Sequence, residues 1–379
     1  MSTAKFDVAI VGAGVVGLSA ALELSLAGAR VIVFDRQQPG LESSWAAAGM
    51  LAPGPDSPGG DALVPLARES SVLYPQFVSL VEDASGLSTS FAQEGTLEVF
   101  PAPAGEFARD EFVAHHRRHG LVAAAISPDL AREMEPSLSA DNGSVAWLPE
   151  EATIDPRRLL EALVSAAKTR GAQIHANCEV SSLLYESRRC AGVIAAGEKT
   201  MARSVLITAG CFSGAMKDGI ARYFPTCPVR GQMISLRHAH VRLTRVLRSE
   251  HGYLVPRSDG RIIAGSTLEH SGFTKAVTPG GVQKILTAAL ELVPALDDAQ
   301  ILETWSGLRP GTPDDLPILG PTDVEGLLVA TGHYRNGILL APVTAKLVRE
   351  WITTGKTNLD VAAFSPLRFQ SSASYVQKL

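Results

Sequence analysis

The apolar residues at the start of the chain follow three successive patterns. Phe6–Val11 is an apolar run of strand length, interrupted by Asp7, and Gly12–Gly17 is a glycine-rich turn. From Val15 the apolar positions recur at helical spacing until Gly28, a residue type common just after a helix. Val31–Phe34 is a second apolar run without alternating polar residues. Two such runs around a helix predict a βαβ unit in a parallel sheet that is covered on both faces.

Further along the chain, two styles of segment alternate. The α/β style returns in two predicted helices and two buried strands, with a third helix beginning near Ile338: Leu66–Ser85, Pro156–Gly171, Val205–Ala209 and Leu327–Ala330. We also predict a strand pair over Gln173–Val180 and Ser182–Tyr185. Other segments have strand character, three of them with period-two content, and predict a second, antiparallel sheet: Gly95–Phe100, Pro228–Leu236, Gly252–Pro256 and Arg261–Ser266.

This interleaving predicts an α/β (α+β) fold with a discontinuous Rossmann-like cofactor-binding domain and an inserted antiparallel-sheet domain. The cofactor-binding domain is expected to take residues 1–90, 148–225 and 305–379. The inserted domain, which we expect to bind substrate, takes residues 91–147 and 226–304.

The composition narrows the range of partners. Against 39 Asp and Glu, the chain carries 34 Lys and Arg, a net charge of −5 that gives no reason to expect nucleic acid or an anionic membrane. The uncharged run Val8–Leu22 is broken by glycines and is shorter than the roughly 20 apolar residues of a membrane span. The four cysteines form no CxxC pair and no zinc-like spacing, as expected of thiols in a reducing compartment. We therefore expect a cytoplasmic protein with no nucleic-acid or membrane partner.

Three histidines have a spacing that could hold a metal ion on a helix. His115, His116 and His119 lie within five residues of one another, but the charged residues around them indicate a solvated helix face. The sequence therefore predicts no metal site.

A GxGxxG motif lies between the first predicted strand and helix, where dinucleotide binding requires it. In this motif Gly12 makes the tight turn, Gly14 lets the backbone approach a pyrophosphate, and Gly17 lets helix and strand pack closely. The phosphates would face the helix N-terminus. Asp35 follows Gly12 by 23 residues, where an acidic side chain binds the adenosine ribose and argues against a 2′-phosphate. The motif alone does not separate FAD from NAD.

Three further segments resemble the D-amino-acid oxidase/glycine oxidase superfamily of FAD-dependent oxidoreductases. They are SSWAAAGMLAP at 43–53, GLRPGTP at 307–313 and GHYRNGI at 332–338. Their spacing and the chain length are most similar to bacterial glycine oxidases of the ThiO type, and the resemblance covers nearly the whole chain. It implies a non-covalently bound FAD, a Rossmann-like FAD-binding domain and a substrate domain built on an antiparallel sheet.

Two of these segments are also suited to flavin on physical grounds. Ser44–Met50 is nearly free of large side chains, so its backbone could approach the cofactor closely. Gly332–Gly337 precedes an apolar helix, whose N-terminal amides could stabilise negative charge on the flavin. The motif and the resemblance together give these candidate cofactor contacts: Gly12, Gly14, Val15, Val16, Gly17, Asp35, Arg36, Ser43, Ser44, Ala47, Ala48, Gly49, Met50, Val180, Ala209, Gly210, Gly332, His333, Tyr334, Arg335, Asn336, Gly337 and Ile338.

Arg309 is the best candidate to bind a substrate carboxylate, because the arginine fork pairs with a carboxylate through two hydrogen bonds. It lies between Trp305 and a proline-rich turn, an apolar setting in which an unpaired guanidinium is costly. The resemblance assigns the substrate carboxylate to Arg309. The alternative is a structural salt bridge to Asp314 or Asp315.

Other substrate contacts follow from the resemblance. It implies that Tyr253 makes a second contact to the carboxylate and that Arg335 lies at the flavin edge close to substrate. We add His251, which stands in the same short segment as Tyr253.

The resemblance implies oxidative deamination of glycine and small D-amino acids, or of secondary amines such as sarcosine, with O₂ as acceptor and H₂O₂ as product. Hydride transfer from the α-carbon needs alignment and a neutral amine, so no residue is assigned as acid or base. The family also suggests a homo-oligomer, a tetramer, and a place in thiamine biosynthesis. Two alternatives stay open. One is a D-amino-acid dehydrogenase or sarcosine-oxidase-like enzyme that passes electrons to another acceptor, and the other is a non-catalytic flavin-binding subunit.

Overall fold

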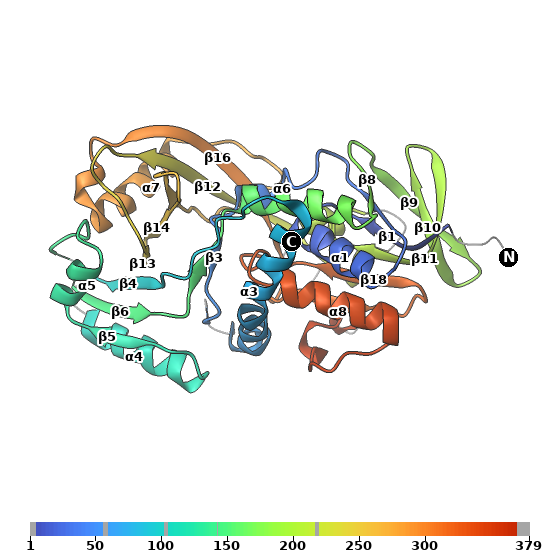
Figure 1. Cartoon of the computed structure of the whole chain (residues 1–379), viewed down its shortest axis with the longest axis horizontal. Helices are drawn as coiled ribbons and strands as arrows, with labels where there is room; N and C mark the ends of the chain where they lie inside the picture. Colours follow the sequence, from blue (N-terminus) through green and yellow to red (C-terminus); the bar gives the residue numbers. More distant parts are fainter. Residues whose placement is uncertain (1–4, 56–59, 102–104, 142, 217–219, 370–379) are drawn as a thin grey trace.

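Two large sheets lie along the long axis of the molecule (Figure 1). The computed structural model describes residues 5–55, 60–101, 105–141, 143–216 and 220–369. Within these residues each large sheet has eight strands, and β3 (Met50–Leu51) and β7 (Ala152–Thr153) form a separate two-stranded ribbon. The mixed α/β class predicted from the sequence is confirmed.

The first sheet is the Rossmann-like part. Its strands lie in the order β17 (Ile318–Pro321), β18 (Leu327–Thr331), β11 (Glu198–Ile207), β1 (Phe6–Val11), β2 (Val31–Phe34) and β8 (Gln173–His175). All neighbours in this order are parallel except β17 and β18. An antiparallel hairpin of β9 (Val180–Glu186) and β10 (Arg189–Ala195) continues from β11. In the βαβ unit at the start of the chain, β1 and β2 begin and end at the residues that the sequence predicts.

Helices cover one face of this sheet: α1 (Val15–Leu26), α3 (Val64–Ser85), α6 (Pro156–Thr169) and α8 (Ala341–Thr354). The side chains of β1 alternate between two cores. Val8 and Ile10 pack against these helices, whereas Ala9 and Val11 pack into a second core with the β9–β10 hairpin and η3 (Ile220–Tyr223). This burial on both faces explains why β1 is apolar from Val8 to Val11.

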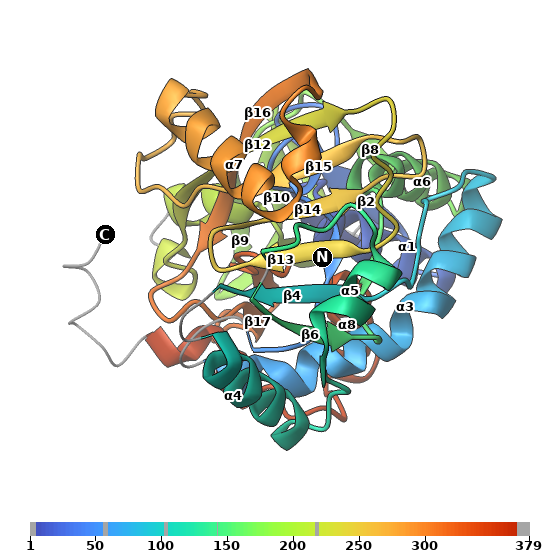
Figure 2. The same ribbon diagram turned by 90° about the vertical axis from the view of Figure 1, so that its left-hand side faces the viewer.

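The second sheet is built from the middle of the chain. Its order is β16 (Gln300–Gly311), β12 (Cys227–Arg237), β15 (Ile262–Gly265), β14 (Gly252–Pro256), β13 (Val246–Ser249), β4 (Thr96–Phe100), β6 (Ser144–Leu148) and β5 (Ala124–Ile126). Neighbours are antiparallel except β13 and β4. Figure 2 shows the strands from β16 to β6 stacked in this order, with α7 (Pro279–Leu292) toward one end of the stack and α4 (Gly105–Arg118) toward the other.

The remaining helical elements are short. They are α2 (Ser43–Ala46), α5 (Pro128–Met134), η1 (Gly60–Leu63), η2 (Gly210–Ala215), η4 (Pro294–Leu296), η5 (Ala362–Phe364) and η6 (Pro366–Phe369).

Three details differ from the sequence-based expectations. The predicted pair Gln173–Val180 with Ser182–Tyr185 is wrong, because β8 pairs with β2 and β9 pairs with β10. The last helix begins at Ala341 rather than near Ile338. β16 was not predicted as a strand, and it pairs with β12 along Gln300–Gly311, on both sides of the expected domain boundary at position 305.

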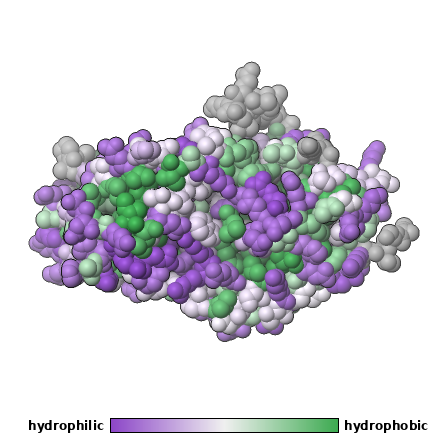
Figure 3. Space-filling model, turned by 90° about the horizontal axis from the view of Figure 1, so that it is seen from above, coloured by the Kyte–Doolittle hydropathy of each residue, from purple (hydrophilic) through white to green (hydrophobic). Residues whose placement is uncertain are grey.

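The molecular surface is mixed in character. Hydrophobic residues form separate patches among hydrophilic ones on the face seen in Figure 3. Among the described residues, no helix is both long enough and apolar enough to cross a membrane.

Candidate active site

One large cavity, of about 910 Å³, is lined by residues of both large sheets. Its wall includes the turn between β1 and α1, the end of β2, residues 42–50 and residues 330–338, together with parts of β12, β14 and β16. Every residue that the sequence singled out as a cofactor or substrate contact lines this cavity, except Gly17.

The glycine-rich turn forms one end of the cavity. Gly12 has a φ of +108°, and a Cβ there would lie 2.6 Å from the carbonyl oxygen of Thr208. Gly17 lies behind this turn, where a Cβ would lie 2.0 Å from the Gly12 carbonyl oxygen. The first intrahelical hydrogen bond of α1 runs from Leu18 N–H to the Gly14 carbonyl, so the N–H groups of the first turn have no intrahelical acceptor. A helix N-terminus of this kind favours an anion such as a phosphate.

Asp35 is fixed beside this turn at the end of β2. Its Oδ2 accepts a hydrogen bond from Ala13 N–H at 2.7 Å, and its Oδ1 accepts one from Gln37 N–H at 2.9 Å. Burial raises the pKa of this carboxyl above its ordinary value, and the two backbone hydrogen bonds oppose the rise. Each carboxylate oxygen has a second lone pair, which leaves the group able to accept from a ligand hydroxyl. Nearby, the guanidinium of Arg36 lies over the ring of Phe212 at 3.4 Å.

The segment that carries Ser44 to Met50 is anchored to both sheets. Ser44 Oγ accepts a hydrogen bond from Val15 N–H at 3.1 Å, next to the glycine turn. The carbonyl of Ala48 accepts one from Arg257 Nη2 at 2.6 Å, on the side of the second sheet. These two bonds hold a nearly side-chain-free stretch of backbone along the cavity wall.

β16 also packs directly on this segment. Trp305 Nε1–H donates to the carbonyl of Ala46 at 3.1 Å. A Cβ on Gly307 would lie 2.5 Å from the Cβ of Ala46, so only glycine allows the two backbones to approach this closely. The strand that carries Arg309 is therefore held directly against the segment proposed to contact the cofactor.

Residues 332–338 form the opposite wall. Gly332 has a φ of +69°, which glycine adopts without strain. The imidazole of His333 is buried with its Nε2 3.1 Å from Thr344 Oγ1, and burial lowers its pKa to about 4. The ring is thus neutral near pH 7. Tyr74 in α3 donates its hydroxyl hydrogen to the carbonyl of Ile338 at 3.0 Å, which fixes the end of this loop.

Arg309 places a guanidinium in the cavity wall, where it donates to neutral acceptors. Its Nη1 donates to the carbonyl of Thr267 at 3.1 Å, and its Nη2 donates to Ser266 Oγ at 2.6 Å. Both acceptors are neutral, and no acidic side chain in the part of the chain that the structure describes forms an ion pair with it. Of the two alternative partners considered above, Asp314 pairs instead with Arg368 at 2.8 Å, and the nearby positive charges that act on Asp315 are Arg335 and His270.

Tyr253, on β14, lines the same cavity as this guanidinium. Its hydroxyl lies 3.3 Å from Met233 Sδ, and a Cβ on Gly265 would lie 2.7 Å from the same hydroxyl oxygen. Gly265 directly precedes Ser266, which binds Arg309. The phenol from β14 and the guanidinium from β16 thus approach two consecutive residues, Gly265 and Ser266.

The two remaining substrate candidates lie where the cavity meets solvent. His251 is about half exposed, and its Nδ1 lies 2.9 Å from Glu291 Oε2. Arg335 is exposed; burial raises the pKa of Asp315, and the nearby charge of Arg335 opposes this rise.

Four other polar residues of the cavity wall were not found from the sequence. Arg248 pairs with Glu98, and its Nη2 lies 3.1 Å from Glu151 Oε1. His116 is buried beside them in α4, and burial lowers its pKa. They come from separate elements with no common local spacing, so no signal in the sequence joins them.

The cavity suits FAD in shape and chemistry. At the glycine turn, Gly12 and Gly14 leave backbone open to the cavity beside the N-terminus of α1, as a pyrophosphate requires. The thiol of Cys211, which also lines the cavity, has a pKa raised to about 12 by burial. It is therefore protonated and a poor nucleophile, which fits a cofactor held without a covalent bond.

Comparison with known proteins gives concordant results. The model of the family described as FAD dependent oxidoreductase matches residues 7–351. A bifunctional protein ThiO/ThiG of Trichormus variabilis is 36% identical over 373 residues, 97% of this chain but 56% of that protein, so the chain spans about half the length of this relative. A glycine oxidase of Pseudomonas aeruginosa is 33% identical over 361 residues, which cover 95% of this chain and 98% of that protein.

Solved structures agree with these matches. The crystal structure of glycine oxidase from Geobacillus kaustophilus has a TM-score of 0.91 at 31% identity, covering 97% of this chain and 99% of that one. The match of the family model to most of the chain, on a cavity that fits a dinucleotide, shows that this chain belongs to the FAD-dependent oxidoreductase family and that its cofactor is FAD.

Proposed function

We propose that this chain oxidises the carbon–nitrogen bond of glycine and small D-amino acids, or of secondary amines such as sarcosine. In the proposed reaction, the amine and O₂ give an imine and H₂O₂, and water then converts the imine to a 2-oxo acid and ammonia or a primary amine. Relatives of similar length named glycine oxidase support this substrate class.

The observation that carries the proposal is the guanidinium of Arg309. It is half-buried in the cavity wall, and its hydrogen-bond acceptors among the described residues are the neutral oxygens of Ser266 and Thr267. A cation in this position without a protein carboxylate is stabilised when an anion enters the cavity. The carboxylate of an amino acid supplies that anion.

Tyr253 and Arg309 together would fix how the substrate lies. With its carboxylate held at two points, the substrate can present only one hydrogen of its α-carbon along the cavity. FAD, when bound, accepts this hydrogen as a hydride. We therefore propose that L-amino acids are poor substrates.

We assign no residue as a catalytic acid or base. The amine is proposed to enter in its neutral form, so no side chain has to remove a proton from it before the hydride is transferred. Arg335 and His251, at the solvent side of the cavity, are proposed to contact the substrate or the edge of the flavin.

Two broader properties also belong to this proposal. The relatives named ThiO/ThiG support a place in thiamine biosynthesis. A homo-oligomer, expected as a tetramer, is tested by the molar mass of the purified protein in light scattering.

The experiment that tests the proposed function is an anaerobic titration of the purified yellow protein. Glycine, sarcosine and D-alanine should each bleach the flavin absorbance, and L-alanine should do so poorly. Admission of air should restore the colour and release H₂O₂, measured with a peroxidase-coupled dye.

Each alternative activity predicts a different result. Bleaching followed by slow reoxidation in air, with fast reoxidation by a quinone, would identify a dehydrogenase. A flavin that no amine bleaches would identify a non-catalytic flavin-binding subunit.

A further inference from the structure

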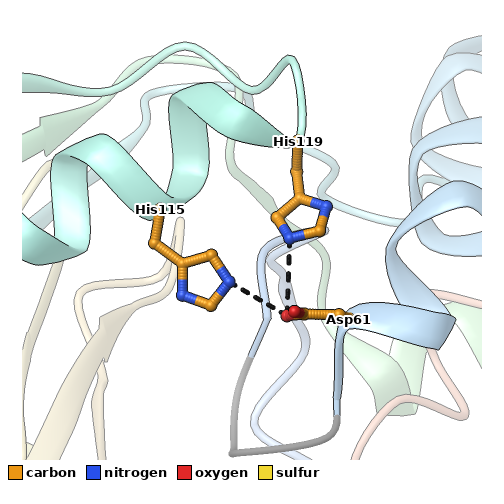
Figure 4. A group of neighbouring side chains, drawn as sticks. All are labelled: Asp61, His115 and His119. Carbon is orange, nitrogen blue, oxygen red and sulfur yellow. Dashed lines mark hydrogen bonds and ion pairs between the residues drawn. The ribbon is translucent and has the colours of Figure 1, made fainter.

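Two of the three histidines set aside in the sequence meet an acidic side chain from a distant segment. His115 lies in the last turn of α4 and His119 lies just beyond it, while Asp61 comes from η1, which leads into α3. Figure 4 shows both imidazoles directed at the carboxylate of Asp61. Sequence spacing shows only the pair of histidines, and the fold supplies the third group.

The distances suit a small divalent ion. His115 Nε2 lies 2.9 Å from Asp61 Oδ1, and His119 Nε2 lies 3.4 Å from the same oxygen. Ligands bound at about 2.0–2.1 Å around a tetrahedral ion are about 3.3 Å apart. All three ligand atoms lie within 4.8 Å of one another, so small side-chain rotations would bring them to one ion. The side chains are 24% to 54% exposed, which leaves a path for the ion and room for water as a further ligand.

The ligand types and the charges around them indicate which ions would bind. The two histidines lie at the C-terminal end of α4, where the helix dipole favours positive charge. Arg68 Nη1 donates to the carbonyl of His119 at 3.1 Å, so a positive charge is already present nearby. Mg²⁺ binds mainly through negatively charged oxygen ligands. Of the three ligand groups here one is a carboxylate, and the guanidinium of Arg68 lies beside His119, so the site suits Mg²⁺ poorly. Two imidazoles and one carboxylate instead suit zinc, cobalt or nickel.

We propose that Asp61, His115 and His119 form a binding site for a divalent transition-metal ion of the zinc type. The ion joins η1 to the end of α4, two elements that the chain separates by more than 40 residues. The site is independent of the proposed oxidase activity and uses none of its residues.

The position of the site gives the ion a structural role. His116, next to His115 on α4, is buried and lines the cavity, where a Cβ on Gly54 would lie 2.3 Å from its Nε2. The same helix thus contacts the cavity wall through His116 and the proposed ion through its neighbours. A bound ion is expected to brace this side of the cavity and to raise the melting temperature.

The test is calorimetric titration of tag-free holoprotein with ZnCl₂ at pH 7.5, after removal of metals with EDTA. Wild type should bind one Zn²⁺ per chain, and its melting temperature should rise with the ion. The variants His115→Ala, His119→Ala and Asp61→Asn should each bind Zn²⁺ at least about tenfold more weakly, because each removes one ligand.

His240→Ala is the matched control, since His240 is an exposed histidine with no ion pair among the described residues. It should bind Zn²⁺ as wild type does. Circular dichroism and flavin content show whether each variant is folded, and Asp61→Asn, which is nearly isosteric, provides the result if a histidine variant is not. Absence of Zn²⁺ binding to wild type, or equal affinity in wild type and Asp61→Asn, would overturn the proposal.

Discussion

Among single residues, Gly14 controls what the cavity can hold at the glycine turn. Its φ of −74° is open to any residue, so Gly14→Val should strain the backbone little. Its Cβ would lie 3.3 Å from Ser44 Oγ, however, and the methyl groups would occupy the space in front of the helix N-terminus. We expect a folded protein that has lost most of its FAD, measured by the ratio of absorbance at 450 and 280 nm. Gly280→Val, at a position with nothing within 4 Å, should keep full FAD. Full FAD in Gly14→Val would place the pyrophosphate elsewhere.

The buried ring of His333 predicts a dependence of stability on pH. Its pKa is about 4 in the folded chain and about 6.5 when exposed. Because the unfolded state binds the proton more readily, the stability that the neutral ring contributes is complete above pH 6.5 and is lost as the pH falls toward 4. Between pH 7 and pH 5, wild type should lose about 2 kcal/mol more unfolding free energy than His333→Asn. Urea unfolding at both pH values with excess FAD measures this difference, and equal losses would contradict a neutral buried ring.

Functional residues that follow a fixed spacing could be predicted from the sequence. Functional residues that only the fold brings together could not. The glycines of residues 12–17 could be interpreted because a strand and a helix flank them directly. Arg248, Glu98 and Glu151 lie more than 50 residues from one another and meet only because β13 pairs with β4. Asp61 reaches the histidines of α4 for a similar reason.

At the scale of elements, the contact between β12 and β16 positions the guanidinium of Arg309. Gly231 in β12 lies beneath this side chain, and a Cβ there would come within 2.2 Å of Arg309 Nη1. Gly231→Ala should therefore displace the guanidinium rather than the backbone, because the crowded atom is at the end of a flexible side chain. We expect unchanged FAD content and lower kcat/KM for glycine, with Gly280→Ala as the control. Wild-type kinetics in Gly231→Ala would mean that this arginine position does not matter for turnover.

The elements that the sequence predicted are those with a strong apolar pattern. β1, β2 and β14 have the predicted limits because each is buried and flanked by turn residues. β16 was missed because it is an edge strand whose first five residues are largely exposed. The pairing of β8 and β9 was wrong because short neighbouring strands in a sequence resemble a hairpin, whereas β8 joins the parallel sheet through β2.

At the scale of the whole molecule, the FAD cavity joins the two sheets, so the cofactor should stabilise the complete fold. A ligand at 100 times its dissociation constant adds about 2.7 kcal/mol to the unfolding free energy. We expect mild acid to release FAD, the melting temperature of the FAD-free protein to fall, and added FAD to restore it. Flavin that stays with the denatured chain would instead indicate a covalent bond, contrary to the protonated Cys211.

The central claim is that the cavity binds an amino acid through its carboxylate at Arg309. The measurement that tests it most directly is kcat/KM for glycine in Arg309→Ala, with FAD content determined on the same sample. Loss of a charge-assisted contact should cost about 2–4 kcal/mol, roughly a 30- to 1,000-fold decrease. Tyr253→Phe, which removes one neutral hydroxyl, should lose only about 2- to 10-fold.

A primary amine without a carboxylate serves as the control substrate, because its turnover should be nearly the same in wild type and Arg309→Ala. The account predicts a large loss of glycine turnover in Arg309→Ala with full FAD and little change for that amine. Unchanged glycine turnover in this variant would contradict it, because the carboxylate would then be bound elsewhere.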